Sequence, residues 1–262
     1  MNSLLIAATG MMAQQLNVEV ISNNIANMRT TGFKRVRAEF QDLLYQDLLA
    51  SGSTTSITGT IMPAGVQIGF GVKTGATSRI HSQGSLINTE KELDLAIRGE
   101  GFFAISLPNG QTAYTRDGSF ELNALGQLVT IDGYQVSPAI TIPSNASSIT
   151  INRTGGVEVL VGDATTPTQV GQLQLTRFIN KAGLKATGDN LFLETPASGT
   201  PSTGTPGAAG IGNVLQKYLE AANVNAVAEL TDLISAQRAY EMNAKVISAS
   251  DEMMSATTNI LR

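Results

Sequence analysis

The sequence has no cysteine and no tryptophan, only one histidine, and 5% aromatic residues in 262. The absence of cysteine excludes disulfide bonds and thiolate metal sites. No nucleophile or carboxylate accompanies the histidine, His81, in a recognised pattern, so we interpret it as structural. Asp117 and Asp132 each precede glycine in a tight turn and are not an acid–base pair. The glycine-rich stretch 69–74 lacks the third glycine of a dinucleotide fingerprint. The sequence therefore predicts no enzyme, no cofactor and no metal site.

Charged residues are also scarce, at 15% of the chain, and the net charge is −4 with a pI near 5.1. An acidic chain without a basic cluster argues against a phosphate-binding surface, so no nucleic-acid partner is expected. The first basic residue is Arg29, so the positive start of a secretory signal is missing and no cleaved signal peptide is expected. Asn, Gln and Gly interrupt every apolar run, so no membrane span is expected either.

What the sequence does contain is a long apolar segment near each end, Leu4 to Met28 and Val214 to Leu261. In both, apolar residues recur every seven positions, which predicts two long helices, the first over about 3–29. The first helix also carries a second apolar stripe on its opposite side. Because two stripes need two neighbours, we hypothesise that these ends are largely disordered in a free monomer and become helical when subunits pack around them.

The heptad positions of both segments give a candidate assembly seam. Its predicted members are Leu4, Met11, Val18, Ile21, Ile25, Met28, Leu219, Leu230, Leu233, Tyr240, Ile247, Met254 and Leu261.

The middle of the chain is organised differently, with short period-two strand patterns separated by Asn-Gly and Asp-Gly turns. This predicts an antiparallel β domain over 79–195. Residues 50–78 are rich in Gly, Ser and Thr, and residues 196–212 are nearly all Ala, Ser, Gly, Thr and Pro. The stretches 33–78 and 196–213 are predicted to form an extended connector. The predicted fold class is α+β: residues 1–32 and 214–262 form a helical polymerisation domain, packed as a coiled-coil-like tube, and the β domain is inserted between its two helices.

Several motifs resemble those of bacterial flagellar rod and hook proteins. Ser22–Asn27 with Thr31–Lys34 resembles the amino-terminal signature. Asn223–Asn225 with Glu229–Leu230 and Gln237–Glu241 resembles the carboxy-terminal one, and Leu95–Phe103 with Tyr114–Phe120 resembles the shared core. The motif residues singled out on this basis are Asn23, Asn24, Asn27, Gly32, Phe33, Lys34, Gln237, Arg238, Ala239 and Tyr240. The stretches Phe40–Tyr45 and Gly65–Gly69 and the total length are most similar to subunits of the distal part of the rod.

The resemblance implies a structural subunit that is exported unfolded by the flagellar type III apparatus, without a cleaved signal peptide. It implies polymerisation into a helical tube that crosses the periplasm, encloses the export channel and transmits torque to the hook. The implied partners are further copies of the chain, proximal rod proteins, the hook protein, the surrounding periplasmic and outer-membrane rings, and the export apparatus. By the same resemblance, residues 46–65 bridge neighbouring subunits, and the second helix lies nearer the channel than the first.

Two alternatives stay open at this point. A proximal rod or hook protein shares both terminal motifs, and only the connector and the length of the β domain separate the three. A cell-wall carbohydrate-binding or hydrolytic β protein with a helical stalk is a different class. It would require a groove with exposed aromatic residues and paired carboxylates, for which the aromatic content is low.

A patch formed by Asn23, Asn24 and Asn27 is consistent with local helix capping or with an amide network between subunits.

Overall fold

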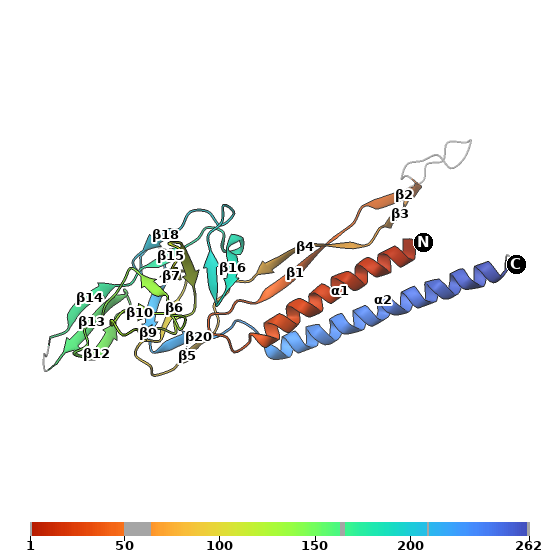
Figure 1. The fold of residues 1–262 in the computed structure, drawn as a ribbon. Coiled ribbons are helices and arrows are strands. Elements are labelled where there is room, and N and C mark those ends of the chain that lie inside the picture. The colour runs from red at the N-terminus through yellow and green to blue at the C-terminus, as the bar shows by residue number, and fades with distance from the viewer. Residues whose placement is uncertain (1, 50–63, 163–165, 209, 261–262) are drawn as a thin grey trace. The chain divides into compact units, whose positions relative to one another are not determined.

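A computed structural model describes residues 2–49, 64–162, 166–208 and 210–260. It divides into two compact units. The helical unit comprises Met1–Ile25, Val36–Ser78 and Asn225–Arg262, and the β unit comprises Ala26–Arg35 and Arg79–Val224. The α+β class is confirmed, with one helix near each end of the chain and a mainly antiparallel β region between them (Figure 1).

The first helix, α1, spans Asn2–Ala26, close to the predicted range. It gives way to a turn in which the Thr30 amide donates to the Asn27 carbonyl at 3.1 Å. Gly32 follows this turn with a φ of +68°, a left-handed conformation that favours glycine, but it does not end the helix, which stops at Ala26. Met28, a predicted seam residue, therefore lies beyond α1.

The second helix, α2, spans Ala226–Ile260, so the prediction of a helix from Val214 is wrong for residues 214–225. The Asn225 side-chain oxygen accepts hydrogen bonds from the amides of Val227 and Ala228, at 3.1 and 3.3 Å, and caps the helix there. The preceding residues pair as strands: β19 (Asn213–Gln216) and β20 (Tyr218–Glu220). Leu219 coincides with the heptad spacing but is half-buried and paired with Ile87 in a strand instead.

The strands of the β unit are mostly short and antiparallel. They are β5 (Leu86–Asn88), β6 (Leu95–Arg98), β7 (Phe102–Ser106), β8 (Thr112–Thr115), β9 (Glu121–Leu122), β10 (Leu128–Val129), β11 (Gln135–Ser137), β12 (Ala146–Ile151), β13 (Gly156–Val161), β14 (Thr168–Gln172), β15 (Leu175–Arg177), β16 (Lys185–Gly188), β17 (Leu191–Leu193) and β18 (Ser202–Gly204), with β19 and β20. A short 3₁₀ turn spans Lys181–Gly183.

A nine-stranded sheet organises this unit, with the order β16-β17-β8-β7-β11-β10-β9 and with β15 joining β7 to β18. The predicted Asn109-Gly110 turn connects β7 to β8, and Gly110 has the positive φ (+81°) that such a turn requires. Side chains from β6, β7, β11, β15 and β19 meet in one core. Its fully buried members include Leu95, Ile97, Phe103, Ile105, Leu175 and Val214.

The stretch 196–213, predicted to be a linker, contains β18, which pairs antiparallel with β15. Ser198 in this stretch is fully buried, and its hydroxyl donates to the Thr195 carbonyl at 2.8 Å. Small residues can pair through their backbone whatever their side chains, so composition alone did not reveal the strand.

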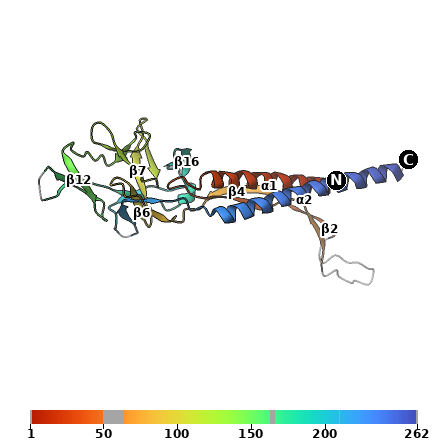
Figure 2. The ribbon, with the colours of Figure 1, turned by 90° about the horizontal axis from the view of Figure 1, so that it is seen from below.

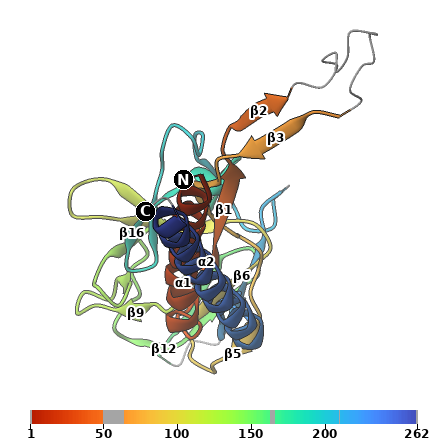
Figure 3. The same cartoon turned by 90° about the vertical axis from the view of Figure 1, so that its right-hand side faces the viewer.

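In the helical unit, α1 and α2 run side by side (Figure 2). The chain leaves α1 through β1 (Val36–Asp42), which pairs with β4 (Val72–Arg79). Beyond them β2 (Tyr45–Leu49) pairs with β3 (Val66–Gly69) as a ribbon directed away from the helices (Figure 3). Most of the predicted bridging stretch 46–65 lies outside the described residues.

The expectation that no segment could span a membrane was too strict. Ser3–Ala26 is long and apolar enough to do so by length and composition alone, a test that core helices of soluble proteins also pass. The polar residues that interrupt its apolar runs are too few to lower the average below that of a spanning helix.

Candidate functional site

Large apolar side chains lie exposed along both helices of the helical unit. On α1, Met12 is 70% exposed and Leu5 52%. On α2 the exposed set is Val227, Leu230, Ile234, Tyr240, Met242, Val246, Met253 and Met254. An apolar surface of this extent indicates a surface that another protein covers.

Several of the side chains through which α1 and α2 meet are small or polar instead. The Asn24 amide donates to Glu229 Oε2 at 3.2 Å, and both residues are buried. The Ser3 and Ser250 hydroxyls lie 3.3 Å apart near the other end of α1. The helix contact therefore leaves most of the large apolar residues available for other contacts.

The structure places the predicted seam residues in several environments. Leu4, Met11, Val18, Ile25, Leu233 and Ile247 are partly exposed, Ile21 is buried, and Leu230, Tyr240, Met254 and Met28 are exposed. Leu219 lies on β20, where it pairs with Ile87, and so does not belong to the stripe on α2. Leu261 lies outside the described residues. The part played by the others in a seam between subunits stays a prediction.

Asn24 is the asparagine that organises the end of α1. Its side chain accepts a hydrogen bond from the Val36 amide at 2.9 Å and donates one to the Val36 carbonyl at 2.8 Å, as a paired strand would. Asn27 instead accepts from the Thr30 hydroxyl at 3.2 Å, a local turn contact. Asn24 thus ties α1 to both α2 and β1 within one chain, a role that neither sequence interpretation anticipated.

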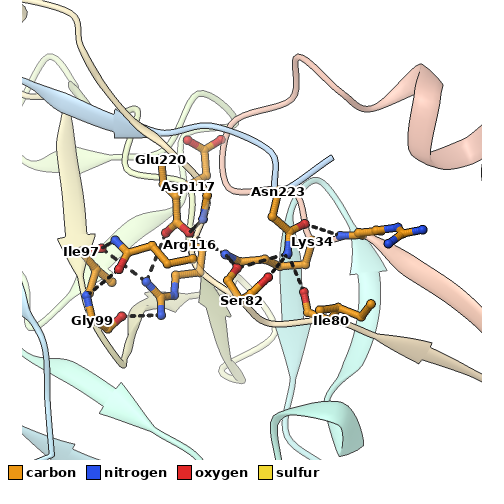
Figure 4. A network of polar contacts seen from close by, with 12 residues as sticks. Lys34, Ile80, Ser82, Ile97, Gly99, Arg116, Asp117, Glu220 and Asn223 are labelled. Atoms are coloured by element: carbon orange, nitrogen blue, oxygen red, sulfur yellow. Dashed lines mark hydrogen bonds and ion pairs between the residues drawn. The ribbon is translucent and has the colours of Figure 1, made fainter. Parts of the chain in front are cut away.

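A buried ion network joins the three family-like motifs inside the β unit (Figure 4). Lys34 Nζ lies 2.5 Å from Glu220 Oε1, and Arg116 Nη1 lies 3.1 Å from Glu220 Oε2. The side chains of Lys34 and Glu220 are 0% exposed and that of Arg116 is 3% exposed. One carboxylate therefore serves two cations without access to water.

Backbone groups add hydrogen bonds to this network, although the buried Arg116 Nε has no hydrogen-bond partner among the described residues. Lys34 Nζ donates to the Ser82 carbonyl at 2.8 Å, and Arg116 Nη2 donates to the Gly99 carbonyl at 2.7 Å. The Gly84 amide donates to Glu220 Oε1 at 2.9 Å. Buried charges need this degree of hydrogen bonding, because an unsatisfied one is strongly destabilising.

Asn223 and Gly32 make further close contacts with backbone groups near this network. The Asn223 side chain accepts from the Arg35 amide at 2.7 Å and donates to the Ile80 carbonyl at 2.8 Å (Figure 4). A Cβ at Gly32 would lie 2.7 Å from the backbone of Arg116, so only glycine fits there. The residue types of these motifs are explained by backbone contacts as well as by charge.

Desolvation controls the titration of the buried cations. Burial lowers the pKa of the Lys34 ammonium from its ordinary value, although the Glu220 carboxylate opposes the shift. Burial also lowers the pKa of the Arg116 guanidinium. Both groups pair with Glu220 and donate hydrogen bonds to backbone carbonyls.

His81 is structural, as predicted. Its ring packs edge-on against Phe102 and Phe192, with centroids 5.9 Å away in each case. Burial first, and then the nearby cations led by Lys34, lower the pKa of His81 to about 4. The ring is therefore neutral near pH 7. Within the described ranges, no group of three or more His, Asp or Glu residues could hold a metal ion.

Sequence reasoning missed the central place of Glu220, Arg116 and Glu229. Each falls within or next to a motif, but its partners are far away in the sequence: Lys34 and Glu220 are 186 residues apart. The sequence offered one signal for such a residue: a charged residue next to apolar residues, as Glu220 follows Leu219.

Comparisons with known proteins follow the same division of the chain. Residues 4–34 match the family described as flagella basal body rod protein. Residues 96–159 match the flagellar hook protein FlgE/F/G D1 domain, and residues 215–260 match the flagellar basal body rod FlgEFG protein C-terminal family.

The family models cover both rod and hook proteins, whereas the following full-length relatives are rod proteins. The chain is 58% identical over 260 residues to the flagellar basal-body rod protein FlgG of Caulobacter vibrioides, covering 99% of both chains. It is 55% identical over 262 residues to the protein of the same name from Agrobacterium fabrum, covering 100% of both. The identity to the FlgG protein of Borreliella burgdorferi is 47% over 264 residues.

Proposed function

Because the chain belongs to the flagellar basal-body rod protein family and is a structural subunit of the distal rod, we propose that it polymerises through the exposed apolar faces of α1 and α2 into a tubular drive shaft. It is not an enzyme, and its place is the flagellar basal body. The full-length relatives favour this role over the proximal-rod and hook alternatives and over a carbohydrate-binding protein.

The observation that carries the proposal is the placement of large apolar residues on the outside of the helices. Met12, Leu5 and Met242 are all more than half exposed in the single chain. Burying a methionine or leucine side chain contributes about 1.5–3 kcal/mol, so several such residues per subunit supply a strong drive to associate. The polar helix contact inside the chain leaves these residues free for that purpose.

A tube needs heterologous contacts, in which different surfaces of one subunit meet different neighbours and the contacts do not close into a ring. The two helices present apolar residues over more than one face, which suits this requirement. We assign the seam residues of α1 and α2, Leu4 to Ile25 and Leu230 to Met254, to these contacts. The coiled-coil-like inner tube, with α2 nearer the channel, is part of the proposal.

The wider partners are proposed from family membership. Proximal rod proteins would contact one end of the tube and the hook protein the other, with periplasmic and outer-membrane rings around it. Export through the flagellar apparatus, without a cleaved signal peptide, agrees with helices that find their full set of contacts only in the assembly. Residues 46–65 are proposed to bridge neighbouring subunits.

Electron microscopy of purified protein after concentration tests the proposal. Ordered tubes support it, and a globular monomer that persists at high concentration contradicts it. Ile25→Asp, which puts a charge on the predicted seam, is expected to block tube formation and to leave the β unit folded by circular dichroism. Normal assembly of that variant would refute the assignment of Ile25 to the seam.

A further inference from the structure

The contact between α1 and α2 has a seven-residue repeat of its own, made of small and polar residues. The repeat on α1 is Ser3, Gly10, Asn17 and Asn24, and that on α2 is Glu229, Ala236, Asn243 and Ser250. It lies one position away from the predicted apolar stripe of α1. Glu229, Ala236 and Ser250 are among the most buried residues of α2.

Three contacts define a single antiparallel register between these repeats. Asn24 Nδ2 lies 3.2 Å from Glu229 Oε2, and the Ser3 and Ser250 hydroxyls lie 3.3 Å apart. Between them, a Cβ at Gly10 would lie 2.8 Å from Asn243 Nδ2, so the Asn243 side chain rests on the glycine. Each step of seven or fourteen residues along α1 is matched by the same step along α2.

Apolar residues cannot select this register by themselves. A slip of seven residues would keep every apolar stripe on the same face of its helix, because the stripes have the same period. The polar pairs do distinguish the two arrangements. In one slipped register Asn24 would face Ala236 and lose its acceptor. In the other, Glu229 would face Asn17, and Asn24 would lie opposite a residue that precedes α2.

We infer that the buried Asn24–Glu229 pair, helped by Gly10 with Asn243, determines the register in which α1 accepts α2. Asn24 is also bound to the Val36 amide and carbonyl, so the register is tied to the exit of the chain into β1. A buried polar pair at a heptad position specifies alignment at some cost in stability. The alignment decides where the exposed side chains of α1 lie relative to those of α2, and hence which composite surface a neighbouring subunit meets.

The absence of cysteine makes the register directly measurable by engineered disulfides. Ser3→Cys with Ser250→Cys reports the native register, since the two hydroxyls already lie 3.3 Å apart. Asn17→Cys with Asn243→Cys reports the slip of seven residues that places Asn24 opposite Ala236. Each pair is introduced into the full-length chain with Glu229 and with Glu229→Met, oxidised after concentration, and separated on denaturing gels so that disulfides within a chain are distinguished from those between chains.

With Glu229 in place, the native reporter is expected to form the disulfide within the chain and the slipped reporter to form little. Glu229→Met removes the acceptor for Asn24 at similar volume, and the ratio of native to slipped cross-link is expected to fall about tenfold. Glu229→Gln keeps an acceptor oxygen and is expected to preserve the ratio. Electron microscopy of the same samples reports separately whether tubes form.

An unchanged ratio in Glu229→Met, with helix content retained, would overturn the inference. Loss of helix content in Glu229→Met would also count against it, because a register device affects alignment rather than helix formation. An equal fall of the ratio in Glu229→Gln would contradict the assigned hydrogen bond.

Discussion

Removing the carboxylate of Glu220 is expected to destabilise the β unit severely. Glu220 accepts from Lys34 Nζ, Arg116 Nη1 and the Gly84 amide, and the two cations are almost completely buried. Glu220→Gln would remove the charged ion-pair partner of both. Breaking a buried pair by removing one partner costs about 3–5 kcal/mol. For a unit of this size the corresponding fall in melting temperature is about 6–20 °C.

Thermal unfolding followed by circular dichroism measures this loss. The matched control is Glu121→Gln, a neutralised glutamate that is exposed at the start of β9 and is expected to change the melting temperature by no more than about 2 °C. The double variant Lys34→Met with Glu220→Gln also removes one of the two buried cations and is expected to recover part of the lost melting temperature. A melting temperature for Glu220→Gln equal to that of the control would refute the role of the buried network.

Three further results are expected. His81 has an unfolded pKa of 6.5 and a folded pKa of about 4, so the unfolded state binds more protons between these pH values. As the pH drops through this window, the free energy of unfolding should fall by about 3 kcal/mol more than in a His81→Phe variant. Urea titrations at several pH values measure this fall, and the same pH dependence in both proteins would contradict the lowered pKa. Gly32→Ala meets both a positive φ and the Arg116 backbone, whereas Gly110→Ala has a positive φ with open space around it, so Gly32→Ala should lower the melting temperature more, and equal effects would contradict the close packing. Met12→Asp should raise the concentration needed for tube formation about tenfold or more, measured by sedimentation, while Met12→Leu should not, and assembly of both at the same concentration would remove Met12 from the interface.

Local patterns predicted much of the fold. The first helix, the Asn-Gly and Asp-Gly turns and the antiparallel strands between them depend on neighbouring residues, which one sequence displays. The start of the second helix was misplaced because Leu219 fits the heptad spacing by coincidence. The Asn225 cap, rather than the apolar period, decides where α2 begins.

The candidate site was predictable only in part. That the apolar stripes of the terminal helices are covered by neighbouring subunits stays a prediction, and we expected those stripes to form the contact between the helices as well. The structure uses Ser3, Gly10 and Asn24 for that contact. The pairing of Lys34 with Glu220 could not be predicted, because no local pattern links residues so distant in the sequence.

Hydrogen exchange of the amides in α1, compared between dilute and assembled protein, tests the central claim most directly. The account predicts that residues 4–26 exchange quickly in dilute monomer and become strongly protected in tubes, while the strands of the β unit are protected in both. Equal, strong protection of residues 4–26 in the dilute monomer would contradict the claim that these helices obtain their cover from neighbouring subunits.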